Sequence, residues 1–403
     1  MEAGARVQLL HLDVYVDEKT PCGGVLQLLG RLRPQWKPKD IKMKMFTEGI
    51  TNQLVGCYVG SLQESEIVLV RVYGKMTELY VDRDREVEMF KILHAHDCGP
   101  QIYCSFQNGI CYEFVRGTTL EDSLLTQPSI YRLIAKEMGK IHSIKLESDN
   151  PADNILWKKM AQFLKLVQNA HGNTTEPQSS KMLHKVYSIK TLSDEMEKLE
   201  RHLSQINSPT VLCHNDLLTK NIIYNHKEGK VRFIDYEYAD YNYQAFDIGN
   251  HFNEFAGVND IDYSLYPSPE LQKDWLRAYL KSYKHSVKLE AIVTEQEVQD
   301  LYVQVCKFSL ASNFFWGLWA ILQARYSSID FDFESVASPP ALRISDRGPT
   351  TFLSEPWRKC DPAGADGTEA VLFQSHWSSR SVSHPWFSCL APLSSRHKLP
   401  QST

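Results

Sequence analysis

The segment that decides the fold is VLCHNDLLTKNIIYNHKEGKVRFIDYEY, residues 211–238. It contains His214, Asp216 and Asn221 in the pattern H-x-D-x-x-x-x-N, and Asp235 follows at the end of the apolar run VRFID. Phosphoryl transfer needs these residue types, because a carboxylate must orient the attacking hydroxyl and hard oxygen ligands must hold Mg²⁺. The spacing predicts that the loop turns Asp216 towards a substrate and Asn221 towards a metal, and that the next strand returns Asp235 to the same site. The alternative is an ordinary polar turn followed by a strand-end carboxylate.

A second candidate element is Arg71 in the β-branched run IVLVRVY, residues 67–73, which predicts a strand buried on both faces. A buried guanidinium needs an anionic partner, and either a phosphate or Glu86, from the helix expected at 86–94, would supply one. The alternative is that Arg71 lies at the edge of the sheet and reaches water. Upstream, residues 47–53 (TEGITNQ) suit a turn whose backbone amides cover phosphates, although they lack the G-x-G-x-x-G pattern.

A third candidate element combines acidic and aromatic residues in the helical half of the chain. The segment FDIGNHFNEF, residues 246–255, places four polar side chains within two helical turns: Asp247, Asn250, His251 and Glu254. In the helix expected at about 295–325, Trp316 and Trp319 are three residues apart and share a face. Aromatic faces stabilise an organic cation by about 0.5–2 kcal/mol each, and a carboxylate would complete a pocket for an ammonium group. The alternative is that these aromatic side chains belong to the core.

Strand-like segments dominate the first part of the chain, and helical segments dominate from Ile130 onwards. This order predicts an α+β, two-lobed fold with a small β-rich N-lobe and a larger α-helical C-lobe. Two short strands, 211–213 and 231–234, bracket the loop quoted above. We expect a partly disordered leader at 1–44, the N-lobe at 45–116, the helical lobe at 117–337 and a disordered Ser- and Pro-rich tail at 338–403.

Composition excludes several classes of protein. The 403 residues include 44 basic and 49 acidic side chains, a net charge of −5, which argues against a nucleic-acid-binding protein that relies on a basic face. Nine cysteines without a C-x-x-C pair suit a reducing compartment rather than a disulfide framework or a zinc ribbon. No signal peptide is recognisable, and the longest apolar run, 314–322, is far shorter than the roughly 20 residues that span a bilayer. We therefore expect a cytoplasmic protein without an integral membrane segment.

Taken together, these residues resemble the choline/ethanolamine kinase family. The matching segments, within residues 45–337, are VLVRVYG, EVEMFKIL, HNDLLTKN, FIDYEYADYNYQAFDIGNHFNEFAGV and FFWGLWAILQA. The resemblance implies a protein-kinase-like fold, ATP and Mg²⁺ as cofactors, and phosphorylation of the hydroxyl of an amino alcohol on the way to phosphatidylethanolamine or phosphatidylcholine. The Leu217-Leu218 pair and Asn253 look like the ethanolamine branch, so ethanolamine is the expected substrate. The resemblance leaves a homodimer open.

The resemblance also implies roles for individual residues in this chain. Asp216 would be the catalytic base, and Asn221 and Asp235 would hold Mg²⁺. The ATP site, in the N-lobe, would comprise Gly49, Thr51, Asn52, Arg71 and Glu86. Glu254, Trp316 and Trp319 would surround the substrate ammonium, and His214 and Asp247 would support the catalytic loop.

Alternatives remain open at this point. The chain could be a choline kinase, or another small-alcohol phosphotransferase such as an aminoglycoside-type enzyme, for which many acidic groups are expected. A catalytically impaired isoform that acts as a binding partner is a different class, although every proposed catalytic residue is present. A protein kinase is disfavoured because no A-P-E pattern follows Asp235. After Ala337 the chain departs from the family pattern, as an alternatively spliced ending would, and we expect lower stability or activity than with a family-type ending.

Overall fold

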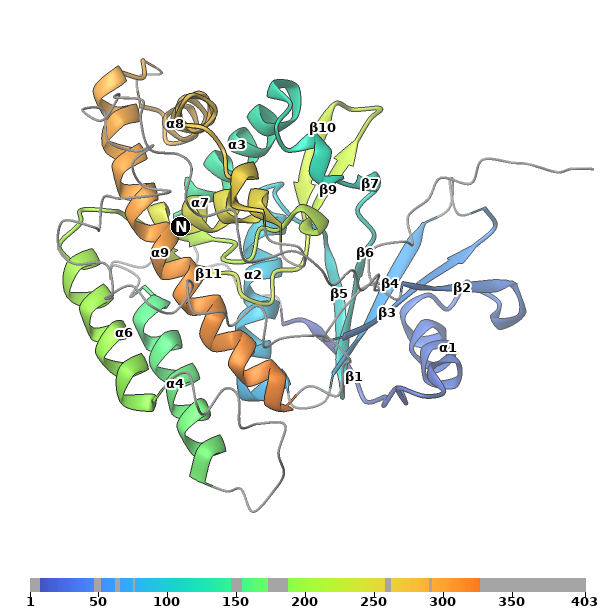
Figure 1. Cartoon of the computed structure of the whole chain (residues 1–403). Helices are drawn as coiled ribbons and strands as arrows, with labels where there is room; N and C mark the ends of the chain where they lie inside the picture. The colour runs from blue at the N-terminus through green and yellow to red at the C-terminus, as the bar shows by residue number, and fades with distance from the viewer. Residues whose placement is uncertain are drawn as a thin grey trace, which may run out of the picture.

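The computed structural model describes residues 8–46, 52–61, 66–74, 77–145, 154–172, 188–257, 262–289 and 292–326. These residues form a sheet-rich lobe followed by a larger helical lobe (Figure 1). The α+β architecture predicted from the order of strand-like and helical segments is therefore confirmed. Gly49, Thr51 and the tail predicted at 338–403 lie outside the described residues.

The N-lobe is built on a six-stranded sheet with the order β1-β5-β6-β4-β3-β2. Its strands are β1 (Leu10–Leu12), β2 (Ile41–Phe46), β3 (Asn52–Val59), β4 (Ile67–Tyr73), β5 (Ile102–Phe106) and β6 (Gly109–Glu113). β1 pairs with β5 in parallel, and all other neighbours are antiparallel. Helix α1 (Pro21–Leu32) packs with one hydrophobic cluster of the sheet, and α2 (Arg83–Ala95) packs with the other.

The central strand β4 shows why the run IVLVRVY has no polar alternation. Val68, Val70 and Val72 belong to the same hydrophobic cluster as the buried residues of α1, whereas Leu69 belongs to the cluster that contains α2. Because side chains alternate along a strand, Arg71 lies on the Leu69 face, towards α2. β4 is flanked by β6 and β3, so the alternative in which Arg71 sits at a sheet edge is wrong.

The structure differs from the prediction for the leader at 1–44, because its described part belongs to the N-lobe. β1 extends the sheet beside β5, α1 packs on it and β2 forms the opposite edge. The predicted boundary at residue 45 falls inside β2. The leader looked irregular because β1 has only three residues and α1 contains three glycines. Gly24 permits a close approach there, since a Cβ would lie 2.8 Å from the backbone oxygen of Tyr15.

The C-lobe is helical, and its longest helix crosses the whole lobe. Its helices are α3 (Pro128–His142), α4 (Leu156–Gly172), α6 (Ile189–Leu203), α7 (Gln244–Asn253), α8 (Pro269–Ser286) and α9 (Glu295–Tyr326). α9 packs against α7, α4 and α8, and α3 packs against α8 (Figure 1).

Short 3₁₀ helices occur in both lobes. They are η1 (Pro38–Asp40), η2 (Thr77–Leu79), η3 (Asp122–Leu124), η5 (Thr219–Asn221), η6 (Glu254–Ala256) and η7 (Tyr263–Leu265).

Two small antiparallel ladders frame the loop that carries Asp216. β8 (Thr210–Cys213) pairs with β11 (Asp240–Tyr243), and β9 (Ile222–Asn225) pairs with β10 (Lys230–Phe233) and with β7 (Thr118–Thr119). The strands predicted at 211–213 and 231–234 are confirmed within one residue. β9 was not predicted, although it forms the hairpin that brings Asp235 back beside the loop.

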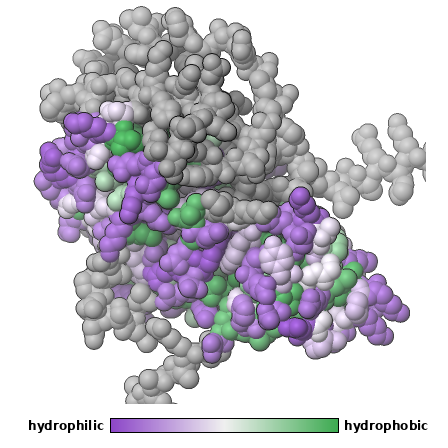
Figure 2. All heavy atoms as spheres, turned by 90° about the horizontal axis from the view of Figure 1, so that it is seen from below, coloured by the Kyte–Doolittle hydropathy of each residue, from purple (hydrophilic) through white to green (hydrophobic). Residues whose placement is uncertain are grey.

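One described helix, α9, is long and apolar enough to cross a membrane by length and composition, over Glu295–Ala324. However, 72% of its most apolar window is buried inside the protein, as expected of a core helix. Figure 2 shows the molecule from below, where hydrophilic side chains predominate among the coloured residues and hydrophobic ones form small groups. We therefore assign α9 to the core of the C-lobe.

Candidate active site

The loop between β8 and β9 is held by His214, which is buried. Burial lowers the pKa of His214, so its ring is neutral and has one N–H donor. Nε2 lies 2.9 Å from the backbone oxygen of Ile234, and Nδ1 lies 3.3 Å from the backbone nitrogen of Asp216. The tautomer that satisfies both contacts has Nε2–H donating to Ile234 while Nδ1 accepts from Asp216. The imidazole thus ties the start of the loop to the segment that leads to Asp235.

Asp247, on α7, holds the same loop from the other side. Its Oδ2 accepts the backbone N–H of His214 at 2.9 Å, and its Oδ1 accepts that of Asn215 at 2.7 Å. Asn215 has a φ of 66°, a left-handed conformation that is strained for a residue with a side chain. The side-chain amide of Asn215 also donates to the backbone oxygen of Tyr238 at 2.9 Å. The turn that presents Asp216 is therefore fixed by several independent hydrogen bonds.

Several other carboxylates lie close enough to Asp216 to act on its charge. Asn221 Nδ2 donates to the backbone oxygen of Asp216 at 2.9 Å and lies 3.4 Å from its carboxylate Oδ2. Burial raises the pKa of Asp216 well above its usual range, and the carboxylates of Asp235, Glu254 and Glu237 raise it further. Such a cluster favours a bound cation, because a metal ion would offset the repulsion between these carboxylates.

Asp235 stands where the chain leaves β10, in a left-handed conformation with a φ of 67°. Its side chain is 36% exposed, although Oδ1 is buried 2.9 Å from Arg71 Nη2. Asn221 uses its amide nitrogen to bind Asp216, and its side-chain oxygen accepts no hydrogen bond from the described residues. The structure therefore brings together Asp216, Asn221 and Asp235, and it leaves oxygen atoms of the kind that Mg²⁺ prefers.

Arg71 is buried at the junction of the two lobes, with 4% of its surface exposed. Nη1 lies 3.0 Å from Glu86 Oε1, and Nη2 lies 2.9 Å from both Glu237 Oε2 and Asp235 Oδ1. Burial alone would lower the pKa of Arg71, but these carboxylates raise it well above its usual range. The ion pair with Glu86 that the spacing allowed is present, and two further carboxylates from the C-lobe join it.

Arg83 and Glu237 extend this network, and the sequence analysis did not identify either. Arg83 Nη1 lies 2.9 Å from Glu86 Oε2 and 3.3 Å from Glu237 Oε2. Asn52 Nδ2 donates to the same Glu237 oxygen at 3.2 Å, and Arg83 Nη2 donates to Asn52 Oδ1 at 3.3 Å. Asn52, at the end of the predicted phosphate-covering turn, is therefore anchored to the C-lobe. Both residues could have been found from their closeness in sequence to identified site residues, since Glu237 is two residues after Asp235 and Arg83 is three before Glu86.

Glu254 acts on Asp216 through its charge, which contributes to raising the pKa of that carboxyl. α7 ends at Asn253, so Glu254 opens the 3₁₀ turn η6 rather than continuing the helix that carries Asp247. Burial, with a smaller contribution from Asp122, raises the pKa of Glu254 to about 7. Among the described residues, no hydrogen bond or ion pair involves the side chain of Glu254, so its carboxylate is available for a cationic ligand.

The predicted tryptophan pair forms an aromatic corner with Tyr238. The ring centroids of Trp316 and Trp319 are 5.6 Å apart at 77°, and those of Tyr238 and Trp316 are 5.3 Å apart at 74°. Trp319 Nε1 donates to the Tyr238 hydroxyl at 2.8 Å, and Trp316 Nε1 donates to Asn250 Oδ1 at 2.7 Å. Both tryptophans are partly buried and pack against the hydrophobic core of the C-lobe. Tyr238 was missed, although it follows Glu237 directly.

The two-lobed fold, with its paired loop and strand carboxylates between the lobes, defines a phosphotransferase of the protein-kinase-like class. The chain belongs to the choline/ethanolamine kinase family, whose model, described as choline/ethanolamine kinase, matches residues 43–340. The chain is 52% identical over 328 residues to human ethanolamine kinase 1, covering 81% of this chain and 72% of that protein. It is 53% identical over 323 residues to human ethanolamine kinase 2, covering 80% of each.

Solved structures share the fold. An ethanolamine kinase from Plasmodium vivax superposes with a TM-score of 0.73 at 27% identity, covering 86% of this chain and 91% of that one. A choline kinase from Cryptosporidium parvum superposes with a TM-score of 0.62 at 25% identity, covering 78% of this chain and 91% of that one.

Proposed function

We propose that this protein is an ethanolamine kinase, which transfers the γ-phosphoryl group of ATP to the hydroxyl of ethanolamine. The observation that carries the proposal is that Asp216 feels the charge of Glu254 and, in turn, acts on Tyr238, the tyrosine of the aromatic corner. Asp216 would accept the proton of the hydroxyl and Glu254 would bind the ammonium group, which matches the two ends of a small amino alcohol. The identity of about half of the residues to ethanolamine kinases supports the same substrate.

Asp216 is the proposed catalytic base. Its carboxylate accepts the proton of the substrate hydroxyl and orients the oxygen for in-line attack on the γ-phosphorus. The hydrogen bonds around His214, Asn215 and Asp247 keep that carboxylate in place, so little reorganisation is needed during the reaction. The raised pKa of Asp216 suits a base that receives a proton in the transition state and later releases it.

Asn221 and Asp235 are the proposed Mg²⁺ ligands. The side-chain oxygen of Asn221 and the partly exposed carboxylate of Asp235 fit this role, because both are hard oxygen donors beside an excess of negative charge. Bound Mg²⁺ would neutralise charge on the ATP phosphates. Arg71 and Arg83 carry two positive charges against three carboxylates, Glu86, Asp235 and Glu237, so the network itself leaves one negative charge for a cation to balance.

The N-lobe supplies the proposed ATP site. Arg71 contacts the phosphates, and Glu86 fixes the guanidinium through the ion pair of 3.0 Å. Gly49, Thr51 and Asn52 cover the phosphates, and the bonds from Asn52 to Glu237 and Arg83 couple that turn to the C-lobe. ATP would therefore bind between the lobes, where its γ-phosphate faces Asp216.

Glu254, Trp316 and Trp319 bind the proposed ammonium group. An NH₃⁺ group needs hydrogen-bond acceptors when it leaves water, and the Glu254 carboxylate, which has no side-chain partner in the described part of the chain, supplies two oxygens. The aromatic faces add cation–π stabilisation for the same charge. Choline kinase activity is the second candidate, because an aromatic corner also suits a quaternary ammonium. We further propose a cytoplasmic protein that binds no nucleic acid, and we retain the homodimer and the impaired binding partner as alternatives.

The test is turnover of the purified chain with Mg²⁺ and ATP, using ethanolamine and choline side by side. We expect phosphorylation of ethanolamine well above choline, and loss of both activities in Asp216→Asn. A preference for choline would overturn the substrate but keep the reaction. No turnover of folded protein with either amine would contradict the proposed function and favour the impaired binding partner.

A further inference from the structure

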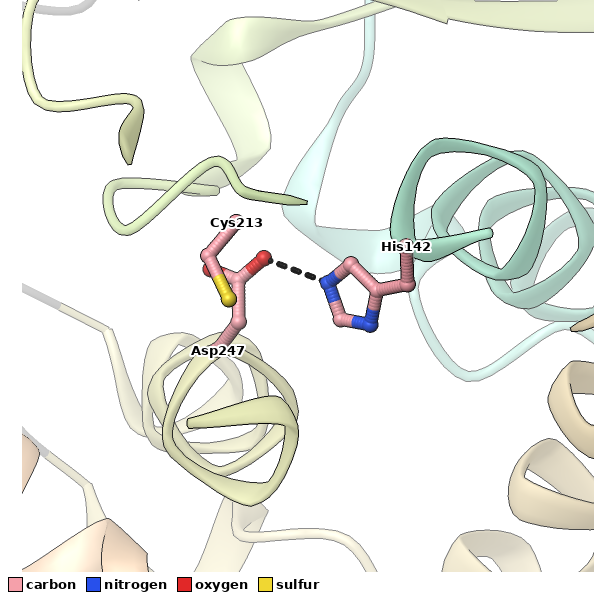
Figure 3. Close-up of side chains that lie close together, drawn as sticks. All are labelled: His142, Cys213 and Asp247. Atoms are coloured by element: carbon pink, nitrogen blue, oxygen red, sulfur yellow. Dashed lines mark hydrogen bonds and ion pairs between the residues drawn. The ribbon is translucent and has the colours of Figure 1, made fainter. Parts of the chain in front are cut away.

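A chain of buried hydrogen bonds leads from helix α8 to Asp247. His142, at the end of α3, is buried, and its Nε2 lies 2.9 Å from Asp247 Oδ2. Its Nδ1 lies 2.7 Å from the hydroxyl of Tyr279, on α8, and Gln244 Nε2 donates to that hydroxyl at 2.9 Å. Figure 3 shows the imidazole of His142 pointing from α3 towards the Asp247 carboxylate on α7. Three helices of the C-lobe thus converge on one carboxylate.

The available donors and acceptors allow only one direction of donation along this series of hydrogen bonds. Gln244 Nε2 can only donate, so the Tyr279 oxygen accepts from it and directs its own proton to His142 Nδ1. His142 Nε2 then carries the proton and donates to Asp247 Oδ2. Burial raises the pKa of Tyr279 well above its usual range, so the hydroxyl remains a donor. A neutral His142 satisfies every group, whereas a protonated His142 would leave the Tyr279 proton without this acceptor.

The series of hydrogen bonds ends at the turn that carries Asp216, the proposed catalytic base. Asp247 Oδ2 accepts from both His142 and the backbone of His214, while Oδ1 accepts from the backbone of Asn215. Burial alone would raise the pKa of Asp247, but the hydrogen bonds that it accepts from His142 and from the backbone of His214 help to lower it below its usual range. The carboxylate therefore stays ionised and keeps one orientation, and Asn215 keeps the strained conformation that sets the direction of Asp216.

Cys213 lies beside this chain but does not belong to it. Its Sγ is within 4.8 Å of ligand atoms of His142 and Asp247, a grouping that could hold a metal ion (Figure 3). However, Sγ donates to the backbone oxygens of Asn242 and Tyr243 at 3.5 and 3.7 Å, and burial raises the pKa of the thiol well above its usual range. A protonated thiol is a poor metal ligand, and the other two side chains already have partners. The cluster is therefore a hydrogen-bonded support.

We propose that His142 is a positioning residue for phosphoryl transfer, and that it acts through Asp247 on the orientation of Asp216. This inference rests on the proposed function for its kinetic consequence, but the structural consequence can be measured separately. Without the imidazole, the Asp247 carboxylate could rotate, and the backbone of the catalytic turn would lose its fixed acceptors. A misplacement of the base by about 1 Å costs up to about 100-fold in rate.

The experiment compares His142→Leu with His142→Gln, whose amide nitrogen can replace Nε2 as the donor to Asp247. In His142→Leu we expect kcat to fall roughly 10- to 100-fold, with the KM values for ATP and ethanolamine changed by less than about two-fold. His142→Gln should recover most of kcat. Amide hydrogen exchange of residues 214–216 should become faster in His142→Leu and return towards the wild-type rate in His142→Gln, which tests the inference without reference to any activity.

Cys213→Ala is the matched control, because it changes the same buried cluster but leaves the hydrogen bonds from Tyr279 through His142 to Asp247 intact. If His142→Leu loses no more kcat or exchange protection than Cys213→Ala, the inference is wrong. If His142→Leu does not fold, Tyr279→Phe removes the proton given to Nδ1 and the acceptor of Gln244 Nε2 but keeps the imidazole, and a wild-type kcat with wild-type protection at 214–216 would overturn the inference. If the wild-type protein has no kinase activity, the proposed function fails while the exchange measurements still decide the role of His142.

Discussion

The carboxylate of Glu254 should make ethanolamine binding depend on pH near neutrality. Burial raises the pKa of this group to about 7 in the free protein, and no described residue neutralises it. Only the ionised form attracts an ammonium group, so affinity should fall as pH falls below that pKa. The amine of ethanolamine resembles that of lysine, whose pKa is about 10.4, and stays protonated throughout this range. The pH dependence of ethanolamine affinity should therefore come mainly from the titration of Glu254.

The magnitude follows from the fraction of Glu254 that is ionised. With a pKa of about 7, the dissociation constant rises by a factor of 1 + 10^(7 − pH), which is about 11 near pH 6, about 2 near pH 7 and about 1.1 near pH 8. Isothermal titration of ethanolamine into the purified protein across this range measures the factor directly. Glu254→Gln should bind more weakly near pH 8 and should show little pH dependence.

Asp216 is an acidic group that also has a raised pKa and interacts with Glu254, so it supplies the control. Asp216→Asn should retain the pH dependence of ethanolamine binding, because the pH-sensitive carboxylate is Glu254. A wild-type affinity that is flat between about pH 6 and about pH 8 would refute the reasoning. So would the same pH dependence in Glu254→Gln, because another group would then be responsible.

Three further changes test other parts of the structure. Asp216→Asn should lower kcat by about 10²- to 10⁴-fold without unfolding the protein, and steady-state kinetics with circular dichroism will check this. Glu237→Gln takes one charge from the pairs with Arg71 and Arg83; it should raise the KM for ATP and lower the free energy of unfolding in urea by up to about 3–5 kcal/mol, and unchanged values would contradict the network. Gly249→Ala should destabilise the protein by about 1–3 kcal/mol, because a Cβ in α7 would lie 2.9 Å from the backbone nitrogen of Ser309 in α9. Gly23→Ala, which meets no atom within 4 Å, is its control and should be neutral or stabilising.

Local patterns predicted much of the fold because each pattern depends on near neighbours. The run 67–73 became the central strand β4, and the helices expected at 86–94 and 295–325 are α2 and α9. The first strand and helix escaped prediction because β1 has three residues and gains its stability from pairing with β5, about ninety residues away. The strand β9 is similarly short and depends on its neighbours β10 and β7.

The sequence by itself determined the residues of the catalytic loop, because Asp216, Asn221 and Asp235 lie on one hairpin-connected segment whose spacing is set by local geometry. Only the tertiary structure decided which partners surround them. Arg71 meets Glu237 across 166 positions of the chain, and His142 meets Asp247 across 105. Such contacts leave no periodic pattern, because they arise where two lobes or three helices converge. The charge balance of the site, the raised pKa values and the support of the catalytic turn all come from that convergence.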